Sequence, residues 1–367
     1  MARKLKSDAV LFTTTLLLLA ISMAWVYSAS VVTANEKFHD PAYVVIRQGI
    51  WVAIGLAFLF GLMRLDYRIF RNRTALLWVA GATVVALVAV FFCRPINSSH
   101  RWLGVGTSVG IQPSEFAKFV AILFVATVLE RRLEEHESLD PGLVQAGILL
   151  VGLAALIMLE PDYGSGIVLL AAAAVMMFVA GLSYRRVVTA MLVLPLPLIA
   201  IMLLEPYRVR RWTAFLNPYA DPFDKGFQTI QSLIAVGTGG VWGKGFMAGV
   251  QKMFYLPEAH SDYIFAVIAE ERGLIGAVAV LLCFVVIIWR GLRVARRAPD
   301  AFGTLLAVGI TTLIGLQAMV NLGVVLSMLP SKGIPLPFVS AGGSSMLVSL
   351  MAMGVLLNIS QQASATE

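Results

Sequence analysis

Apolar residues fall in long uninterrupted blocks along almost the whole of this chain of 367 residues. A block of about 18 residues or more is long enough for a helix to cross a bilayer. The recurrence of such blocks predicts an all-α polytopic membrane protein, folded as a single integral-membrane domain over residues 1–367. About ten transmembrane helices are expected, at 10–32, 44–63, 74–93, 113–130, 142–160, 163–181, 187–204, 262–290, 303–327 and 343–359.

The basic residues between these blocks predict the orientation. They are dense in one set of alternate segments, which contains Arg3, Lys4 and Lys6, then Arg64, Arg68, Arg71 and Arg73, then Arg131 and Arg132, then Arg185 and Arg186, and finally Arg290, Arg293, Arg296 and Arg297. Cytoplasmic loops are enriched in Lys and Arg. We therefore expect both termini to be cytoplasmic and Asp262 to face outward. The first block exceeds the usual ~7–15 apolar residues of a signal peptide, so it is interpreted as a span.

One connection, the outer loop 205–261, is too long to be a plain connector. YRVRRWTAFL, at 207–216, mixes arginine with aromatic residues, as a helix on a membrane surface does. GFQTIQSLIAVG, at 226–237, suits a second interfacial helix. The glycine-rich GTGGVWGKG, at 237–245, lacks the spacing of a nucleotide-binding loop. It is interpreted as a tight-turning segment, with a backbone cradle for an anionic diphosphate as the alternative.

Composition excludes several other classes of protein. Hydrophobic residues make up 59% of the chain and charged residues only 13%, against about a quarter in soluble proteins. The net charge of +7 belongs to the cytoplasmic loops, so it does not indicate a nucleic-acid partner. The two cysteines, Cys93 and Cys283, and the four scattered histidines have no metal-ligand spacing.

Five polar clusters lie at the expected outer ends of the spans: HRWLGVG at 100–106, QPSEFAKF at 112–119, LEPDYGSG at 159–166, LPEAHSD at 256–262 and LPSKGIPLPFVSAGGSS at 329–345. An ionised group near hydrocarbon costs ~2.5–3.5 kcal/mol, so such residues usually mark a functional site. The best candidate is Asp262, where a loop becomes a helix and a carboxylate can meet a polar substrate. We interpret it as a catalytic base. The alternative is that Ser261 or Asp262 only caps the helix. Glu270 and Glu271 are expected to support packing.

The other clusters supply candidate substrate-binding residues. Arg101 precedes an interfacial tryptophan and could meet either substrate or lipid phosphate. Glu115 and Lys118 share a helical face, so they either bind substrate or neutralise each other inside the protein. Asp162 lies at the outer end of a span and could also belong to a solvated turn.

The final cluster contains three prolines, which cannot continue a helix. Non-helical backbone at membrane depth is tolerated only where protein covers it or where it lines a cavity. In this segment Lys332 could meet a phosphate, and Ser344 lies where the last span begins.

Taken in order on ten spans, these motifs resemble the SEDS (shape, elongation, division and sporulation) family of peptidoglycan glycosyltransferases over nearly the whole chain. VQKMFYLPEAHSDYIFAVIAEERGLIG, at 250–276, and the final cluster are the most specific matches, and NPYADPFDKGFQTIQS, at 217–232, reinforces them. YLPEAHSD and SKGIPLPF are more similar to the division branch, FtsW, than to the elongation branch, RodA. One departure is Ala341, where the family usually has tyrosine.

The resemblance implies polymerisation of lipid II, the undecaprenyl-diphosphate-linked disaccharide-pentapeptide, at the bacterial inner membrane. It implies that Asp262 is the essential residue and that Arg101, Glu115, Lys118 and Asp162 match family motifs. Arg210, Arg211 and Lys332 are further candidates to neutralise the diphosphate, mainly from their charge and expected face. Implied partners are a class B penicillin-binding transpeptidase and other division proteins. No cofactor is required, although a divalent cation, magnesium or manganese, could share the charge.

Two rival functions remain open. A transporter that flips lipid II would also need intramembrane charges, but it should show a polar path or repeats around a midplane site, and no clear repeat is present. A non-catalytic scaffold for division proteins would not need Asp262.

Overall fold

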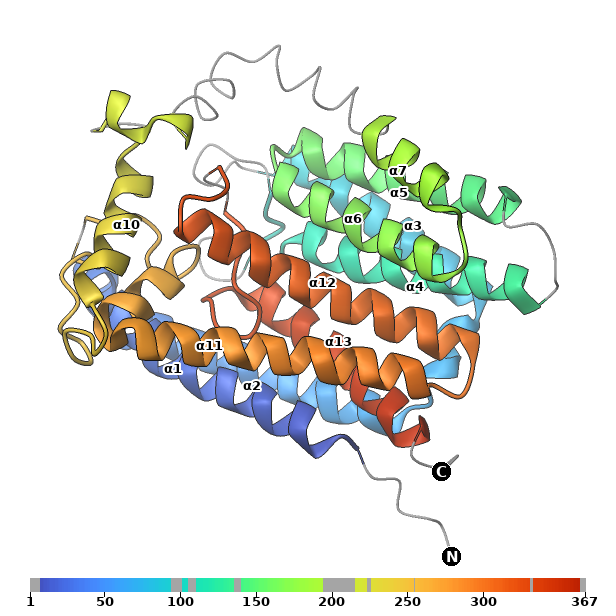
Figure 1. Ribbon diagram of the computed structural model, residues 1–367, viewed down its shortest axis with the longest axis horizontal. Coiled ribbons are helices and arrows are strands. Elements are labelled where there is room, and N and C mark those ends of the chain that lie inside the picture. Colours follow the sequence, from blue (N-terminus) through green and yellow to red (C-terminus); the bar gives the residue numbers. More distant parts are fainter. Residues whose placement is uncertain are drawn as a thin grey trace, which may run out of the picture.

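The computed structural model describes residues 7–93, 101–104, 110–134, 140–193, 215–222, 226–253, 255–330 and 333–363. These residues form helices and contain no β-strand; their only bridge joins Leu103 and Ile111. Long helices lie side by side in an elongated bundle (Figure 1). They are α1 (Ala9–Phe38), α2 (Tyr43–Arg64), α3 (Arg73–Ala89), α4 (Pro113–Glu134), α5 (Asp140–Leu159), α6 (Tyr163–Val179), α7 (Tyr184–Val193), α10 (Phe227–Gly239), α11 (Ile264–Arg297), α12 (Ala301–Val325) and α13 (Gly343–Ala363), with short 3-10 helices η1 (Tyr67–Arg71), η2 (Val90–Phe92) and η3 (Pro218–Ala220).

The expected spans agree with these helices. α7 covers only the first part of the expected span 187–204, whose remainder lies outside the described residues. Within the described part of the chain, six helices are long and apolar enough to cross a membrane: α1, α2, α3 together with η2, α11, α12 and α13. Two shorter helical stretches, Val144–Leu159 and Tyr163–Val179, are also apolar. The prediction of an all-α polytopic membrane protein is confirmed.

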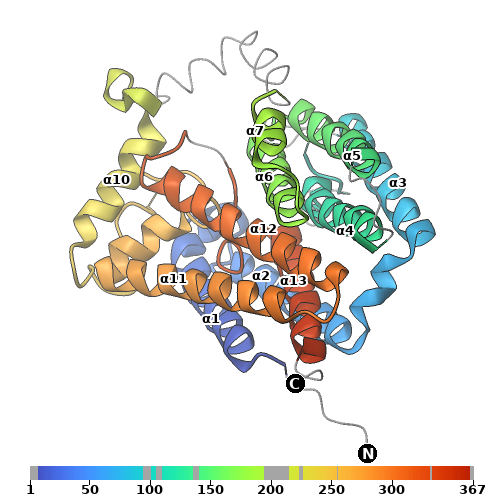
Figure 2. The same ribbon diagram turned by 45° about the vertical axis from the view of Figure 1, so that its right-hand side comes forward.

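Helices α12 and α13 lie at the centre of the bundle. Figure 2 shows α3 to α7 grouped on one side and α1, α11 and α10 on the other, with α12 and α13 between them. Almost all of α13 is buried, whereas α2 exposes much of its surface. Glycine allows α13 to approach α2 closely, because a Cβ at Gly354 would lie only 2.8 Å from the carbonyl oxygen of Leu59.

The bundle has two ends, which we call the terminal end and the Asp262 end. The terminal end carries the start of α1 and the end of α13, where Asp8 accepts hydrogen bonds from Arg290 and its own N–H donates to Ser360. The Asp262 end carries the loop before α11 and the starts of α4, α6 and α13 (Figure 1). Helices α4, α6, α11 and α13 therefore have their N-termini at the Asp262 end.

The glycine-rich segment 237–245 packs against a kink in α11. Gly273 interrupts that helix with a φ of 65°, and the N–H groups of Lys244 and Gly245 donate to the carbonyls of Glu270 and Glu271. The tight-turn interpretation is confirmed. Because these two N–H groups are already used, they are not available to cradle a diphosphate. Helix α10, which was expected from the outer loop, lies beside this segment.

Glu270 and Glu271 are fully buried, and each accepts a hydrogen bond from a lysine in this packing. Lys252 Nζ lies 2.6 Å from Glu271 Oε1, and Ser28 Oγ donates to the same oxygen over 2.6 Å. Lys244 Nζ donates to Glu270 over 2.8 Å. The expectation that these acids support packing is confirmed, since they join the outer loop to α1 and α11.

Candidate functional site

Asp262 lies in the turn that leads into α11, next to the non-helical segment that precedes α13. A Cβ added at Gly333 would lie 2.6 Å from Asp262 Oδ2, so the backbone of that segment passes directly against the carboxylate. The buried Asn321 amide donates to the carbonyls of Asp262 and Ile334, over 2.8 Å in each case. One side chain of α12 thus holds the carboxylate-bearing loop and the opposing segment together.

The same two segments are joined by further hydrogen bonds. Ser340 Oγ donates to the carbonyl of Ser261, and the N–H of Ala341 donates to the carbonyl of His260 over 2.9 Å. Gln48, a buried residue of α2, donates to the carbonyl of Ser340 over 3.1 Å. Because Ala341 acts here through its backbone, this contact does not need the tyrosine usual in the family.

Asp262 does not cap α11. The residue at the cap position is Tyr263, and it makes no capping bond with its side chain in the described structure. Ser261 Oγ faces Glu258 instead. The capping alternative is therefore wrong. The Asp262 carboxyl is not needed to begin the helix and remains a candidate for contact with substrate.

Four helix N-termini meet around this loop. The N–H of Gln112, just before α4, donates to Ser344 Oγ at the start of α13 over 2.9 Å. The Gln112 amide and Ser114 Oγ reach Asp162 Oδ2, at 3.2 and 3.3 Å, and Asp162 caps α6 through the N–H of Ser165. Each helix N-terminus carries roughly half a positive elementary charge. The N-termini of α4, α6, α13 and α11 together make a region suited to an anion.

Arg101 adds a full positive charge near this region. Its Nε donates to the carbonyl of Glu160 over 3.0 Å and its Nη2 to the carbonyl of Pro161 over 2.6 Å. The Glu160 side chain is completely buried, and neither of its oxygens has a hydrogen-bond partner among the described residues. Burial, with the charge of Asp162, raises the pKa of Glu160 to about 8. This carboxyl is therefore largely neutral at physiological pH.

The electrostatics of Asp262 suit proton transfer near neutral pH. Burial, together with the charges of Glu258 and Asp162 and against the opposing charge of Arg101, raises the pKa of Asp262 to about 7. A general base works best when its pKa lies near the working pH. These interactions also place Arg101 and Asp162 within electrostatic reach of the carboxylate, as a shared site requires.

Glu115 and Lys118 form the ion pair that their spacing suggested. Lys118 Nζ lies 2.7 Å from Glu115 Oε1, and only 1% and 2% of the two side chains are exposed. The pair stands in the first two turns of α4, behind Gln112 and Ser114. Its neutralising role inside the bundle is confirmed, and a contact with substrate stays a prediction.

The structure thus brings together Asp262, Arg101, Asp162 and Ser344, with the Glu115–Lys118 pair beneath them. Arg210, Arg211 and Lys332 lie outside the described residues. The sequence patterns did not identify Gln48 and Asn321, two residues that position the loop of Asp262 and the segment before α13. Each is a buried amide inside an apolar span, and that signal could have identified both.

The residues of the site do not form a cage for a divalent cation. The described part of the chain has no group of three or more His, Cys, Asp or Glu side chains able to hold a metal ion. Magnesium and manganese sites in proteins usually rely on carboxylate oxygens, often completed by substrate phosphates.

Comparison with known proteins gives a consistent picture. The family model of cell cycle proteins that covers FtsW, RodA and SpoVE matches residues 8–365. The chain is 43% identical over 360 residues to "Stage V sporulation protein E" of Bacillus subtilis, covering 98% of each chain. It is 40% identical over 361 residues to "Probable peptidoglycan glycosyltransferase FtsW" of Geobacter metallireducens, covering 98% of this chain and 96% of that one.

Two solved structures resemble the fold of this chain over nearly its whole length. A chain of a peptidoglycan synthase complex that coordinates polymerization and crosslinking aligns with a TM-score of 0.78 and 28% identity, covering 98% of this chain and 99% of that one. The rod shape determining protein RodA of Thermus thermophilus aligns with a TM-score of 0.69 and 24% identity, covering 98% of both. The second likeness concerns the fold alone.

Proposed function

Because this chain belongs to the FtsW, RodA and SpoVE family of cell cycle proteins, we propose that it is a peptidoglycan glycosyltransferase that polymerises lipid II into glycan strands. The observation that carries the proposal is Asp262. It is a carboxyl with a pKa near 7, held against Gly333 at a meeting point of four helix N-termini. A base and an anion-binding region lie side by side, as transfer from a diphosphate requires.

The chemistry is a single displacement. Asp262 removes the proton from the 4-hydroxyl of the acceptor N-acetylglucosamine, and that oxygen attacks the anomeric carbon of the donor N-acetylmuramic acid. A new C–O bond forms as the bond to the diphosphate breaks, and the configuration at the anomeric carbon inverts. Undecaprenyl diphosphate leaves with the bonding electron pair, and the proton stays on Asp262 until solvent accepts it.

The helix ends and Arg101 stabilise the leaving diphosphate. Hydrogen-bond donors aimed at developing charge are usually the largest single contribution to catalysis. Arg210, Arg211 and Lys332 belong to the same proposal by charge and by expected face. If a divalent cation takes part, it arrives on the diphosphate of the substrate, since the residues that the structure describes offer no cage of their own.

We place the Asp262 end outside the cytoplasmic membrane and the terminal end in the cytoplasm. The support is the distribution of basic residues, which concentrate in the segments at the terminal end. In this orientation the catalytic loop meets lipid II on the face where glycan strands are assembled.

The partner that we propose is a crosslinking enzyme, a class B penicillin-binding transpeptidase. The structural relative at a TM-score of 0.78 belongs to a complex that coordinates polymerization with crosslinking. The FtsW name of several relatives supports a role in cell division, alongside other division proteins.

The test is lipid II polymerisation in detergent, with the cognate transpeptidase present, comparing wild type, Asp262→Asn and Glu258→Gln. Asn keeps the size of the side chain and removes the base, so glycan ladders should fall by at least ~10²-fold. Glu258→Gln removes an exposed carboxylate from the same loop and should leave the ladders in place. Thermal unfolding should be similar for all three proteins.

Each outcome is informative. Turnover by Asp262→Asn at the wild-type rate would eliminate the base assignment. If wild type itself makes no ladder although it is folded and bound to its partner, the polymerase proposal fails. A lipid II flippase or a non-catalytic scaffold would then account better for the chain.

A further inference from the structure

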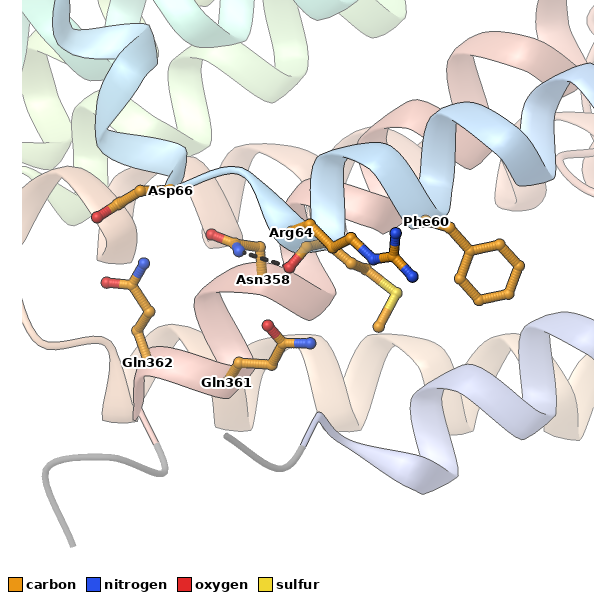
Figure 3. Close-up of a pocket in the computed structure, with 7 residues that line it drawn as sticks. Phe60, Arg64, Asp66, Asn358, Gln361 and Gln362 are labelled. Atoms are coloured by element: carbon orange, nitrogen blue, oxygen red, sulfur yellow. Dashed lines mark hydrogen bonds between the residues drawn. The ribbon is translucent and has the colours of Figure 1, made fainter. Parts of the chain in front are cut away.

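A pocket of about 380 Å³ opens at the terminal end of the bundle, and Figure 3 shows the residues that line it. We call it the terminal pocket. It is lined by Phe60, Met63 and Arg64 at the end of α2, by Asp66 just beyond, and by the amide side chains of α13, among them Asn358. Its volume lies in the lower part of the range for small-ligand sites, about 300–1,000 Å³.

The frame of the terminal pocket is firmly held. The buried Asn358 amide donates to the carbonyl of Met63 over 2.9 Å and accepts from the N–H of Tyr67 over 3.0 Å. These bonds lie on either side of the turn that carries Arg64 and Asp66, and Figure 3 shows the first of them. Both charges are therefore presented on a turn that is fixed against α13.

Opposite charges line the pocket without pairing with each other. Arg64 makes no ion pair with any residue that the structure describes. Asp66 accepts from the N–H of Arg68 over 2.9 Å and lies a long 3.8 Å from its guanidinium, which is bound to Asp300 at 2.9 Å. The Asp66 side chain is 53% exposed, so it retains room for another cation. This arrangement suits a ligand that carries both a negative and a positive group.

The groups are also ordered by depth. Phe60 is one helical turn before Arg64, about 6 Å nearer the middle of the span, and Asp66 follows beyond the end of the helix. Phe60, Phe58 and Ile54 are all exposed large apolar residues of α2, a helix that presents much of its surface to lipid. From the bilayer outward the pocket therefore offers apolar surface, then a cation, then an anion.

We propose that the terminal pocket binds a zwitterionic phospholipid of the phosphatidylethanolamine type. Its acyl chain lies along Phe60 and Met63, its phosphate meets Arg64, and its ammonium group meets Asp66 and the amide oxygen of Gln362. The lipid comes from the leaflet at the terminal end, which is the inner leaflet in the orientation proposed above. A purely anionic headgroup would bring negative charge against Asp66 with no ammonium to balance it.

The test is photo-crosslinking of the full chain in phosphatidylcholine nanodiscs. A trace of phosphatidylethanolamine with a diazirine on its acyl chain is activated, and the labelled peptides are mapped by mass spectrometry. Labelling of α2 near Phe60 is expected. Unlabelled phosphatidylethanolamine should compete about tenfold more strongly than phosphatidylglycerol, in line with one additional charged hydrogen bond. Inorganic phosphate should not compete.

Two variants and a control sharpen this test. Arg64→Gln should weaken competition by both lipids about tenfold, because both carry a phosphate. Asp66→Asn, which keeps the bond from the N–H of Arg68, should abolish only the preference for phosphatidylethanolamine. Arg73→Gln removes an exposed arginine at the same end and should change neither value.

The proposal is overturned by any of three results. These are labelling that maps away from α2, equal competition by the two lipids in wild type, or an unchanged lipid preference in Asp66→Asn. Thermal unfolding is measured for each variant. Lipid competition is compared only among variants that are as stable as wild type, which excludes a failure to fold.

Discussion

Asp262 makes the pH dependence of polymerisation predictable. With a pKa of about 7, the carboxylate is roughly one-tenth ionised at pH 6 and roughly nine-tenths ionised at pH 8. A general base acts only when ionised, so activity is lost as the pH falls through this value. The value of kcat/KM should therefore rise about tenfold between pH 6 and pH 8. An aspartate at the ordinary value of ~3.9 would give a flat profile over the same range.

Two neighbours of Asp262 should move this profile in opposite directions. The negative charge of Glu258 raises the pKa of Asp262, so Glu258→Gln should shift the midpoint to lower pH. The positive charge of Arg101 lowers that pKa, so Arg101→Ala should shift the midpoint to higher pH. Arg101→Ala should also slow turnover at every pH if the guanidinium stabilises the diphosphate.

The assay is the initial rate of glycan formation from lipid II at a concentration well below KM, measured from pH 5.5 to pH 9 with the transpeptidase present. Low substrate matters because kcat/KM reports ionisations in the free enzyme, which is the state that the structure describes. A flat wild-type profile would refute the assignment of a raised pKa to the base. Midpoints that move in the same direction in both variants, or not at all, would refute the electrostatic account of the loop.

Two further substitutions test the surroundings of the site. Lys118→Ala leaves the Glu115 carboxylate buried without its cation, which should cost about 3–5 kcal/mol of stability. The double change Lys118→Met with Glu115→Leu should recover thermal stability, and a single variant as stable as wild type would contradict the buried pair. Gly333→Ala should reduce polymerisation at least ~10-fold without unfolding the protein, because the new Cβ would displace Asp262. Gly342→Ala, whose Cβ would meet only ordinary contacts, is the matched control, and equal activity of the two variants would argue against this reasoning.

The membrane fold could be predicted almost completely from the sequence. An apolar run long enough to span a bilayer must form a helix there, because unpaired backbone groups are too costly in hydrocarbon. This local constraint explains why spans such as 44–63 and 303–327 agree with α2 and α12 within a few residues. The sequence also singled out Asp262 as the candidate catalytic carboxylate, since it is a charge at the edge of an apolar run and lies in a specific motif.

The sequence left other local alternatives open because each was compatible with the same residues. A carboxylate before a helix can cap it or remain available, and only the position of Tyr263 at the cap decided against capping. A glycine-rich segment can bind an anion or pack tightly. In the structure, N–H groups of the glycine-rich segment donate to α11 carbonyls at the kink around Gly273, which shows that this segment packs tightly.

The helical spans, the class of protein, the family and the candidate residues depend on short segments, so they could be inferred from local patterns. Which of these residues meet follows from the folded arrangement of the helices. Asp262 faces Gly333 across 71 residues of chain because Asn321, Ser340 and Ala341 bind the two segments together. The raised pKa of Asp262 follows from that burial. Such properties depend on the distance and dielectric between groups that are remote in sequence, and no local pattern carries that information.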